Sequence, residues 1–153
     1  MAERKHEDEI AREKEALFER SLQTRGFRYG LHKVWPEADW EFHKKHEEWV
    51  EFVYLKERNL DRRVKELVIC AIIGTLKSQP GHIVSHINAA VKAGATKEEI
   101  IEVFELCGHW GGTLAQSNAL EAWRQVFAPD LPGAFQPMSG SEEPPRGGGA
   151  RPR

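Results

Sequence analysis

The spacing of apolar residues along the chain predicts helices throughout and no strand. Apolar side chains recur three and four residues apart, as one face of a helix requires. No segment alternates apolar and polar residues with period two over a useful length. The pattern predicts an all-α fold, with helices over residues 3–24, 39–58, 62–77, 81–93, 96–107 and 113–127.

Turn and capping residues separate these predicted helices. Asn59 and Asp61 supply a stop and a fresh N-cap before residues 62–77, the most apolar element and the expected central core helix. Gly94 fits a left-handed helix end. Thr96 and Glu99 have the spacing of a capping box at the next helix start. Glycines and a proline over 26–36, and the stretch GHWGG at 108–112, are interpreted as breaks.

The two ends of the chain differ in character from its centre. Residues 3–24 are highly charged and carry few large apolar residues, so this helix is expected to be solvated or laid against a partner. Residues 129–153 are rich in Pro and Gly and have little to bury, which predicts disorder. We therefore divide the chain into a charged N-terminal helix (1–26), a helical domain (27–128) and a tail (129–153).

Charge and composition narrow the class of partner. The 153 residues carry a formal net charge of -2, so no global basic field draws nucleic acid or an anionic membrane. The N-terminus lacks the apolar core of a signal peptide, and we expect a cytoplasmic protein with a small-molecule partner. Cys70 and Cys107 each lie in an apolar helical pattern, as reduced and buried thiols do.

Three polar residues in the apolar centre are candidates for chemistry. Glu66 lies on the most apolar predicted helix, where a carboxylate needs a partner or a raised pKa. A salt bridge to an adjacent basic residue is the structural alternative. His82 and His86 share one helix face, and His82 falls in the first turn after Pro80. A helix N-terminus disfavours protonated His and attracts anions, which suits a carboxylate-bearing substrate.

Further candidates lie outside this trio. His109 has a glycine on its N-terminal side and could contact a substrate or merely end a helix, and Trp110 could line a pocket or pack in a core or subunit interface. His82 and His86 with Glu66 or His109 could form a three-ligand metal site, but the spacing does not require one, and no cofactor is expected. His43 and His46 stand among Lys and Glu, which indicates a solvated helix face.

The order of these features resembles a known family. Its features here are LDRRVKELVICAII, then HIVSHINAAVKAGATKEEIIEVFEL, then GHWGGTLAQSNAL, within about residues 27–127. The pattern is similar to the carboxymuconolactone decarboxylase family, which includes the alkylhydroperoxidase D-like proteins. The resemblance implies an all-α, alkylhydroperoxidase D-like helical bundle that assembles as a homo-oligomer, a trimer or a hexamer.

The resemblance also bears on the reaction. In the peroxidase branch of the family, a Glu is followed by a Cys-x-x-Cys-x-x-x-His motif; here Glu66 and His86 match the Glu and the His, whereas Gln79 and His82 replace the two cysteines. Without paired thiols, thiol redox chemistry is disfavoured. We expect a lyase acting on a small carboxylated lactone or ring-cleavage product, with His86 as acid/base, Glu66 as its partner, and His82, His109 and Trp110 around the substrate. A redox protein, a metal enzyme of this fold and a noncatalytic binding module are the alternatives.

Overall fold

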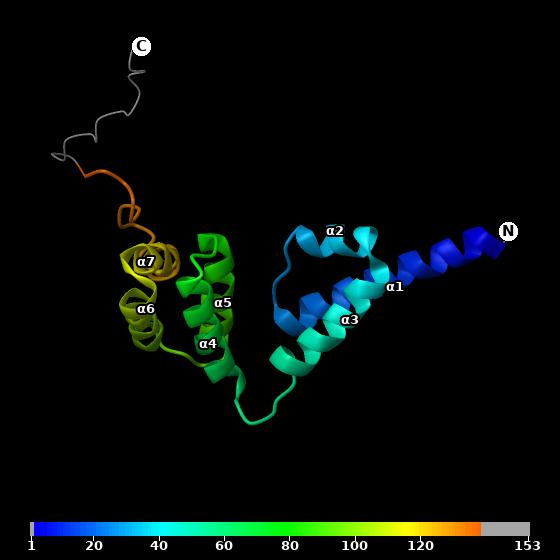
Figure 1. Cartoon of the computed structure of the whole chain (residues 1–153), viewed down its shortest axis with the longest axis horizontal. Helices are drawn as coiled ribbons and strands as arrows, with labels where there is room; N and C mark the ends of the chain where they lie inside the picture. The colour runs from blue at the N-terminus through cyan, green and yellow to red at the C-terminus, as the bar shows by residue number, and fades with distance from the viewer. Residues whose placement is uncertain (1, 139–153) are drawn as a thin grey trace, which may run out of the picture.

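The computed structural model describes residues 2–138, and every regular element within them is helical (Figure 1). The elements are α1 (Ala2–Arg25), α2 (Leu31–Ala38), α3 (Trp40–Val50), the π-helix η1 (Glu51–Leu55), α4 (Arg62–Thr75), α5 (Pro80–Lys92), α6 (Lys97–Gly111) and α7 (Thr113–Phe127). The all-α prediction is confirmed. No helix in this part of the chain is long and apolar enough to cross a membrane.

Helices α4 to α7 form a bundle with its own apolar core. Helices α4 and α7 each contact the other three helices of the bundle, so the predicted central place is not unique to α4, whose Val68 and Ile72 are exposed. The core contains fully buried Phe104, Ile83, Ile87 and Ile100, each of which stabilises the fold by roughly 1.5–3 kcal/mol relative to an exposed position. Cys70 and Cys107 are free and buried in the same core, as their sequence pattern predicts.

The predicted caps set the ends of the bundle helices. The Asp61 carboxylate accepts a hydrogen bond from the Val64 backbone N–H at 2.8 Å and begins α4. Thr96 and Glu99 form both bonds of the capping box at the start of α6. Gly94 has a φ of +95°, which a side chain would strain, just beyond the end of α5. These three predictions are confirmed.

Helices α1 to α3 form a second lobe, joined to the bundle through residues 56–61 (Figure 1). Two expectations for this region are wrong. Helix α2 forms inside the predicted break at 26–36, because burial of His32 and Pro36 against the lobe outweighs the backbone hydrogen bond that Pro36 removes. The helix predicted to continue to residue 58 instead widens into η1 and ends at Leu55.

Two of the three buried residues of α3, His43 and Glu47, are polar, so the predicted solvated face is wrong for His43. His43 and Glu47 are buried, whereas the Trp49 side chain is 60% exposed. The reason is a buried ion pair: Arg25 and Arg28 donate to the same Glu47 oxygen at 2.6 and 2.9 Å. This contact attaches the end of α1 and the following loop, residues 26–30, to α3.

The first residues of the predicted tail are hydrogen-bonded to α7. The Arg124 guanidinium donates to the backbone carbonyls of Pro129 and Leu131, and the Glu121 carboxylate accepts from the Ala134 N–H at 2.7 Å. These bonds hold the chain after α7 against that helix. The rest of the predicted tail, residues 139–153, lies outside the described residues.

Candidate active site

A buried carboxylate, Glu66, is the centre of a hydrogen-bonded network between the two lobes. Its side chain is fully buried. One oxygen, Oε2, lies 2.8 Å from Nδ1 of His86. The other, Oε1, accepts from the Tyr54 hydroxyl at 2.5 Å and from Nε of Arg62 at 2.7 Å. Both carboxylate oxygens therefore have partners, as a buried charge requires.

Three different elements supply these partners. Arg62 is the first residue of α4, one turn before Glu66, and His86 lies in the middle of α5. Tyr54 lies on η1, where the wider π-helical turn sets the direction of the side chain. The Lys65 ammonium donates to the backbone carbonyls of Tyr54 and Lys56, so α4 itself holds the end of η1 in place.

The network keeps Glu66 ionised. Burial alone would raise the pKa of this carboxyl, but hydrogen bonds from His86 and Tyr54 and the charge of Arg62 outweigh burial and lower the pKa below its ordinary 4.5. Burial and the carboxylate together raise the pKa of Tyr54, so its hydroxyl stays protonated and donates. Arg62 also donates to that hydroxyl at 2.6 Å, which closes a ring of three side chains.

The ionised carboxylate fixes the tautomer of His86. A carboxylate only accepts hydrogen bonds, so Nδ1 of His86 must be protonated and donate the hydrogen bond to Glu66. The second nitrogen, Nε2, is then free to accept or deliver a proton. The ring packs edge-on against Phe27 at 5.0 Å between centroids and is 7% exposed. This is the arrangement of an oriented acid/base group.

His82 lies beside His86, as their spacing predicts. The two ring centroids are 5.2 Å apart, and Tyr29 packs edge-on against His82 from the loop of residues 26–30. Nδ1 of His82 is 2.7 Å from the Ser78 hydroxyl. Burial first and His86 second lower the pKa of His82, so its ring is neutral at neutral pH. The structure thus brings Glu66, His82 and His86 together.

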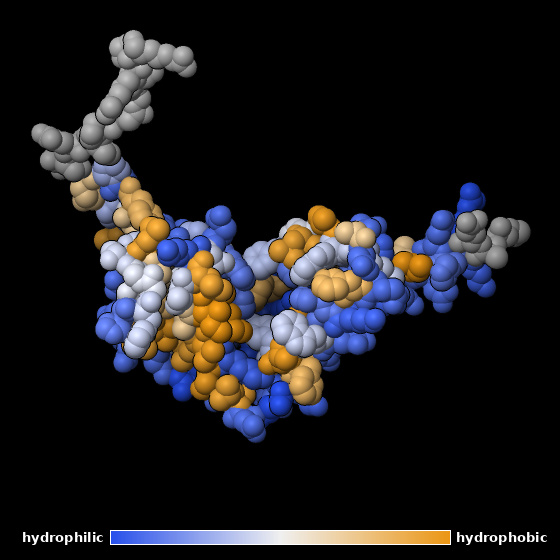
Figure 2. Space-filling view, in the orientation of Figure 1, coloured by the Kyte–Doolittle hydropathy of each residue, from blue (hydrophilic) through white to orange (hydrophobic). Residues whose placement is uncertain are grey.

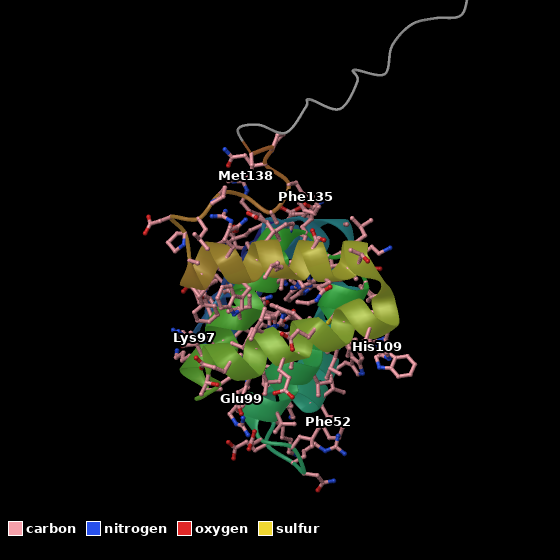
Figure 3. The ribbon with its side chains drawn as sticks, turned by 90° about the vertical axis from the view of Figure 1, so that its left-hand side faces the viewer. Phe52, Lys97, Glu99, His109, Phe135 and Met138 are labelled. Atoms are coloured by element: carbon pink, nitrogen blue, oxygen red, sulfur yellow. The ribbon has the colours of Figure 1, made fainter. Side chains whose placement is uncertain are left out.

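The structure does not bring His109 and Trp110 to this trio. Both are exposed at the end of α6, and Figure 3 shows His109 at the margin of the bundle. Their rings contact each other at 5.0 Å, and neither makes a hydrogen bond or ring contact with Glu66, His82 or His86. Among the described residues, no three His, Cys, Asp or Glu side chains are grouped so as to hold a metal ion.

The two thiols are poorly suited to redox chemistry. Burial, with the nearby Glu66 carboxylate as the second cause, raises the pKa of Cys70 to about 12. The nucleophilic thiolate is therefore strongly disfavoured there. The Cys107 thiol is buried and lies within hydrogen-bonding distance of the Ala71 carbonyl, at 3.4 Å. Both cysteines behave as core residues.

Sequence reasoning missed Tyr54 and Phe27 and treated Arg62 only as an unnamed alternative. The adjacent basic residue that could pair with Glu66 is Arg62, and the structure shows that this salt bridge and the His86 bond coexist. Tyr54 is the one hydroxyl-bearing residue in the apolar run EFVYL, which is a weak signal. Phe27 precedes the bundle by many residues, and nothing in its local pattern places it over His86.

A comparison with known families covers this site. The model of the carboxymuconolactone decarboxylase family matches residues 46–125, a span that contains Tyr54, Arg62, Glu66 and His86. No curated protein and no solved structure matches the chain.

The Tyr54 hydroxyl should stabilise the ionised form of Glu66. We expect Tyr54→Phe to lower the free energy of unfolding at neutral pH by about 1.5–3 kcal/mol, the range for a hydrogen bond to a charged group. The pKa of Glu66 is lower in the folded state than in the unfolded state. This stabilisation is therefore present above pH 4.5, the ordinary pKa, and is lost as the pH falls through the pKa of the folded protein. Urea unfolding from about pH 7 down to about pH 3 measures the difference between variant and wild type.

Tyr29→Phe is the matched control, because the hydrogen bonds of the Glu66 network come from Tyr54, Arg62 and His86 and not from the Tyr29 hydroxyl. We expect Tyr29→Phe to show no comparable loss in the free energy of unfolding at any pH. A Tyr54→Phe variant as stable as wild type at neutral pH would contradict the assignment of an ionised Glu66 that depends on the Tyr54 hydroxyl.

Proposed function

Because the chain belongs to the carboxymuconolactone decarboxylase family, we propose that it is a cofactor-independent lyase that releases CO₂ from a small carboxylated lactone or related ring-cleavage product. The observation that carries the proposal is the bond between the buried Glu66 carboxylate and Nδ1 of His86. That bond leaves Nε2 as an acid/base group of fixed orientation, which is what the protonation step of a decarboxylation needs.

The reaction balances with this one acid/base group. The bond between the carboxylate carbon and the ring breaks, and its electron pair is delocalised into a conjugated carbonyl of the substrate while CO₂ leaves. A proton from Nε2 of His86 then goes to carbon, and solvent returns a proton to the imidazole. During the cycle the negative Glu66 balances the positive charge of protonated His86. A positioned group of this kind accelerates such a step by roughly 10²- to 10⁴-fold.

The remaining candidates take supporting roles in this proposal. His82, neutral and in contact with His86, is a donor or acceptor for the substrate. Tyr54 and Arg62 hold Glu66 ionised and are positioning residues. A substrate contact by His109 and Trp110 stays a prediction. These exposed side chains do not contact Glu66 or His86 of their own chain, so the contact would have to be at the site of another copy of the chain.

The alternative of thiol redox chemistry has less support. Cys70 and Cys107 are buried core residues, and the raised pKa of Cys70 opposes thiolate formation. A noncatalytic binding module also has less support. Burial of a charge costs stability, and a binding module gives no reason to bury an ionised carboxylate that orients a histidine.

Replacement of either member of the pair should abolish most of the turnover. We expect Glu66→Gln and His86→Gln each to lower kcat on carboxymuconolactone by about two orders of magnitude or more, because one loses the orienting charge and the other the acid/base group. Release of CO₂ measures the reaction, and circular dichroism checks that each variant is folded.

Three controls make the result specific. Glu105→Gln and His6→Gln change the same residue types at exposed positions and should leave kcat unchanged. The double variant Cys70→Ala, Cys107→Ala should keep its turnover, apart from a loss of stability of roughly 1–3 kcal/mol from the core. A cysteine-free variant that is inactive, beside active Gln variants, would replace this proposal with the redox alternative.

We also propose that the chain assembles as a homo-oligomer, a trimer or a hexamer of alkylhydroperoxidase D-like bundles. The support is a stripe of exposed Val68 and Ile72 on α4 and Leu76 at its C-cap, one residue per turn. Figure 2 shows hydrophobic residues gathered on the bundle. Monomers seldom leave apolar faces of this kind uncovered.

The stripe gives the assembly a direct test. Light scattering at micromolar concentration should report a trimer or a hexamer for wild type. Ile72→Glu should shift it to smaller species, because a charge in a closed apolar interface is costly. Glu102→Lys changes an exposed position elsewhere and serves as the control. A monomeric wild type would contradict the proposal.

A further inference from the structure

The acid/base residue of the proposed site is largely enclosed in this structure. His86 is only 7% exposed. The rings around it are those of Phe27, His82 and Tyr54, with centroids 5.0, 5.2 and 6.0 Å from its own. A substrate that takes a proton from Nε2 has to come within hydrogen-bonding distance of that atom. A ring-shaped substrate needs more open surface there, so part of this wall has to move before it binds.

Phe27 is the part of the wall with the least backbone support. Tyr54 and His82 lie on η1 and α5, where helical hydrogen bonds hold the backbone. Phe27 instead lies in the loop between α1 and α2, on the side of the lobe that faces α5 (Figure 1). We call residues 27–29 of this loop the flap. A glycine stands at each end of the flap, at positions 26 and 30.

The two glycines can act as pivots for the flap. Gly26 has a φ of +85°, which a residue with a side chain rarely adopts. Gly30 has a φ of -54° and a ψ of -33°, which suit any residue in a helix. A Cβ atom at either position would meet no other atom within 4 Å. Neither glycine is therefore needed to save space, and what each one contributes is backbone freedom.

One ion pair holds the closed flap against α3. Nη2 of Arg28 lies 2.9 Å from Oε2 of Glu47, and both side chains are 4% exposed. Nε of Arg28 is buried and has no hydrogen-bond partner among the described residues, which is a cost of the closed state. Arg25 binds the same Glu47 oxygen at 2.6 Å. Glu47 therefore keeps a partner when Arg28 leaves, and opening frees the unsatisfied N–H for water.

We propose that the flap is a gate that opens about its two glycines and admits the substrate to His86. Opening carries Phe27 away from His86 and Tyr29 away from His82. Closure over a bound substrate returns the rings and excludes water from the proton transfer. The inference rests on the proposed function for what enters, whereas the opening itself is a property of the fold and can be measured without a substrate.

The two glycines provide a matched pair of variants with opposite expected effects. Gly26→Ala strains the closed backbone at a φ of +85°, so it should favour the open flap. Gly30→Ala is compatible with the closed backbone and restricts the open one, so it should favour closure. Arg28→Gln removes the ion pair without a change in the backbone. Arg20→Gln, which removes an exposed ion pair of α1, is the control for that variant.

The measurement is the rate at which diethyl pyrocarbonate modifies His86 at neutral pH. The reagent reacts with an unprotonated imidazole nitrogen that it can reach, so the rate reports the population of the open flap. Mass spectrometry of fragmented peptides separates His86 from His82. Exposed His6 in the same sample is the reference for free access. His43, which is 3% exposed on α3, reports any unfolding of the lobe.

The gate predicts a distinct pattern of rates. His86 of wild type should react at least about tenfold more slowly than His6. Gly26→Ala and Arg28→Gln should each raise the His86 rate by about fivefold or more, and Gly30→Ala should lower it by about twofold to fivefold. Arg20→Gln should leave it unchanged, and His43 should stay slow in every variant.

Three results would overturn the proposal. The first is a wild-type His86 that reacts as fast as His6, because nothing would then cover it. The second is a change in the same direction, or no change, in the two glycine variants. The third is a His43 rate that rises together with the His86 rate, because the lobe would then unfold as a whole.

Kinetics with carboxymuconolactone separate the gate from the reaction. Gly30→Ala should lower kcat/KM for release of CO₂ by about twofold to fivefold, because a smaller fraction of the protein is open to substrate. A protein that released no CO₂, yet showed opposite labelling changes in the two glycine variants, would refute the proposed reaction and support the gate. Normal turnover with equal labelling of His86 in all variants would refute the gate and leave the reaction standing.

Discussion

The structure around the candidate site depends on one buried negative charge. Glu66 has no access to water, so its ionised form exists only because Tyr54, Arg62 and His86 bind both of its oxygens. Each donor comes from a different part of the chain, and their convergence fixes how η1, α4 and α5 meet. Removal of any one donor leaves a charge that the surrounding core cannot solvate.

The N-terminal lobe forms part of the site, because side chains from it contact the site histidines. Arg25 and Arg28 share Glu47, and this buried contact holds the loop of residues 26–30. From that loop, Phe27 packs against the ring of His86 and Tyr29 against the ring of His82. The bundle thus supplies Glu66, His82 and His86, and the lobe covers the rings of the two histidines.

Sequence patterns predicted the features that depend on residues within one helical turn of each other. The N-cap at Asp61, the capping box at Thr96 and the shared face of His82 and His86 each follow from spacing within one turn. The polar buried face of α3 could not be predicted, because Glu47 is buried only by arginines about twenty residues earlier in the chain. Tyr54 escaped notice for a similar reason, since its role arises from a π-helical turn and a carboxylate on another helix.

The tautomer of His86 is the property on which the acid/base account rests, and nitrogen NMR of the imidazole reports it directly. Two-bond and three-bond proton couplings to ¹⁵N-labelled histidine distinguish the two ring nitrogens. The account predicts that Nδ1 of His86 carries a proton and donates it in a hydrogen bond to Glu66. An unprotonated Nδ1 with a proton fixed on Nε2 would contradict it, because an ionised Glu66 would then have no donor at Oε2.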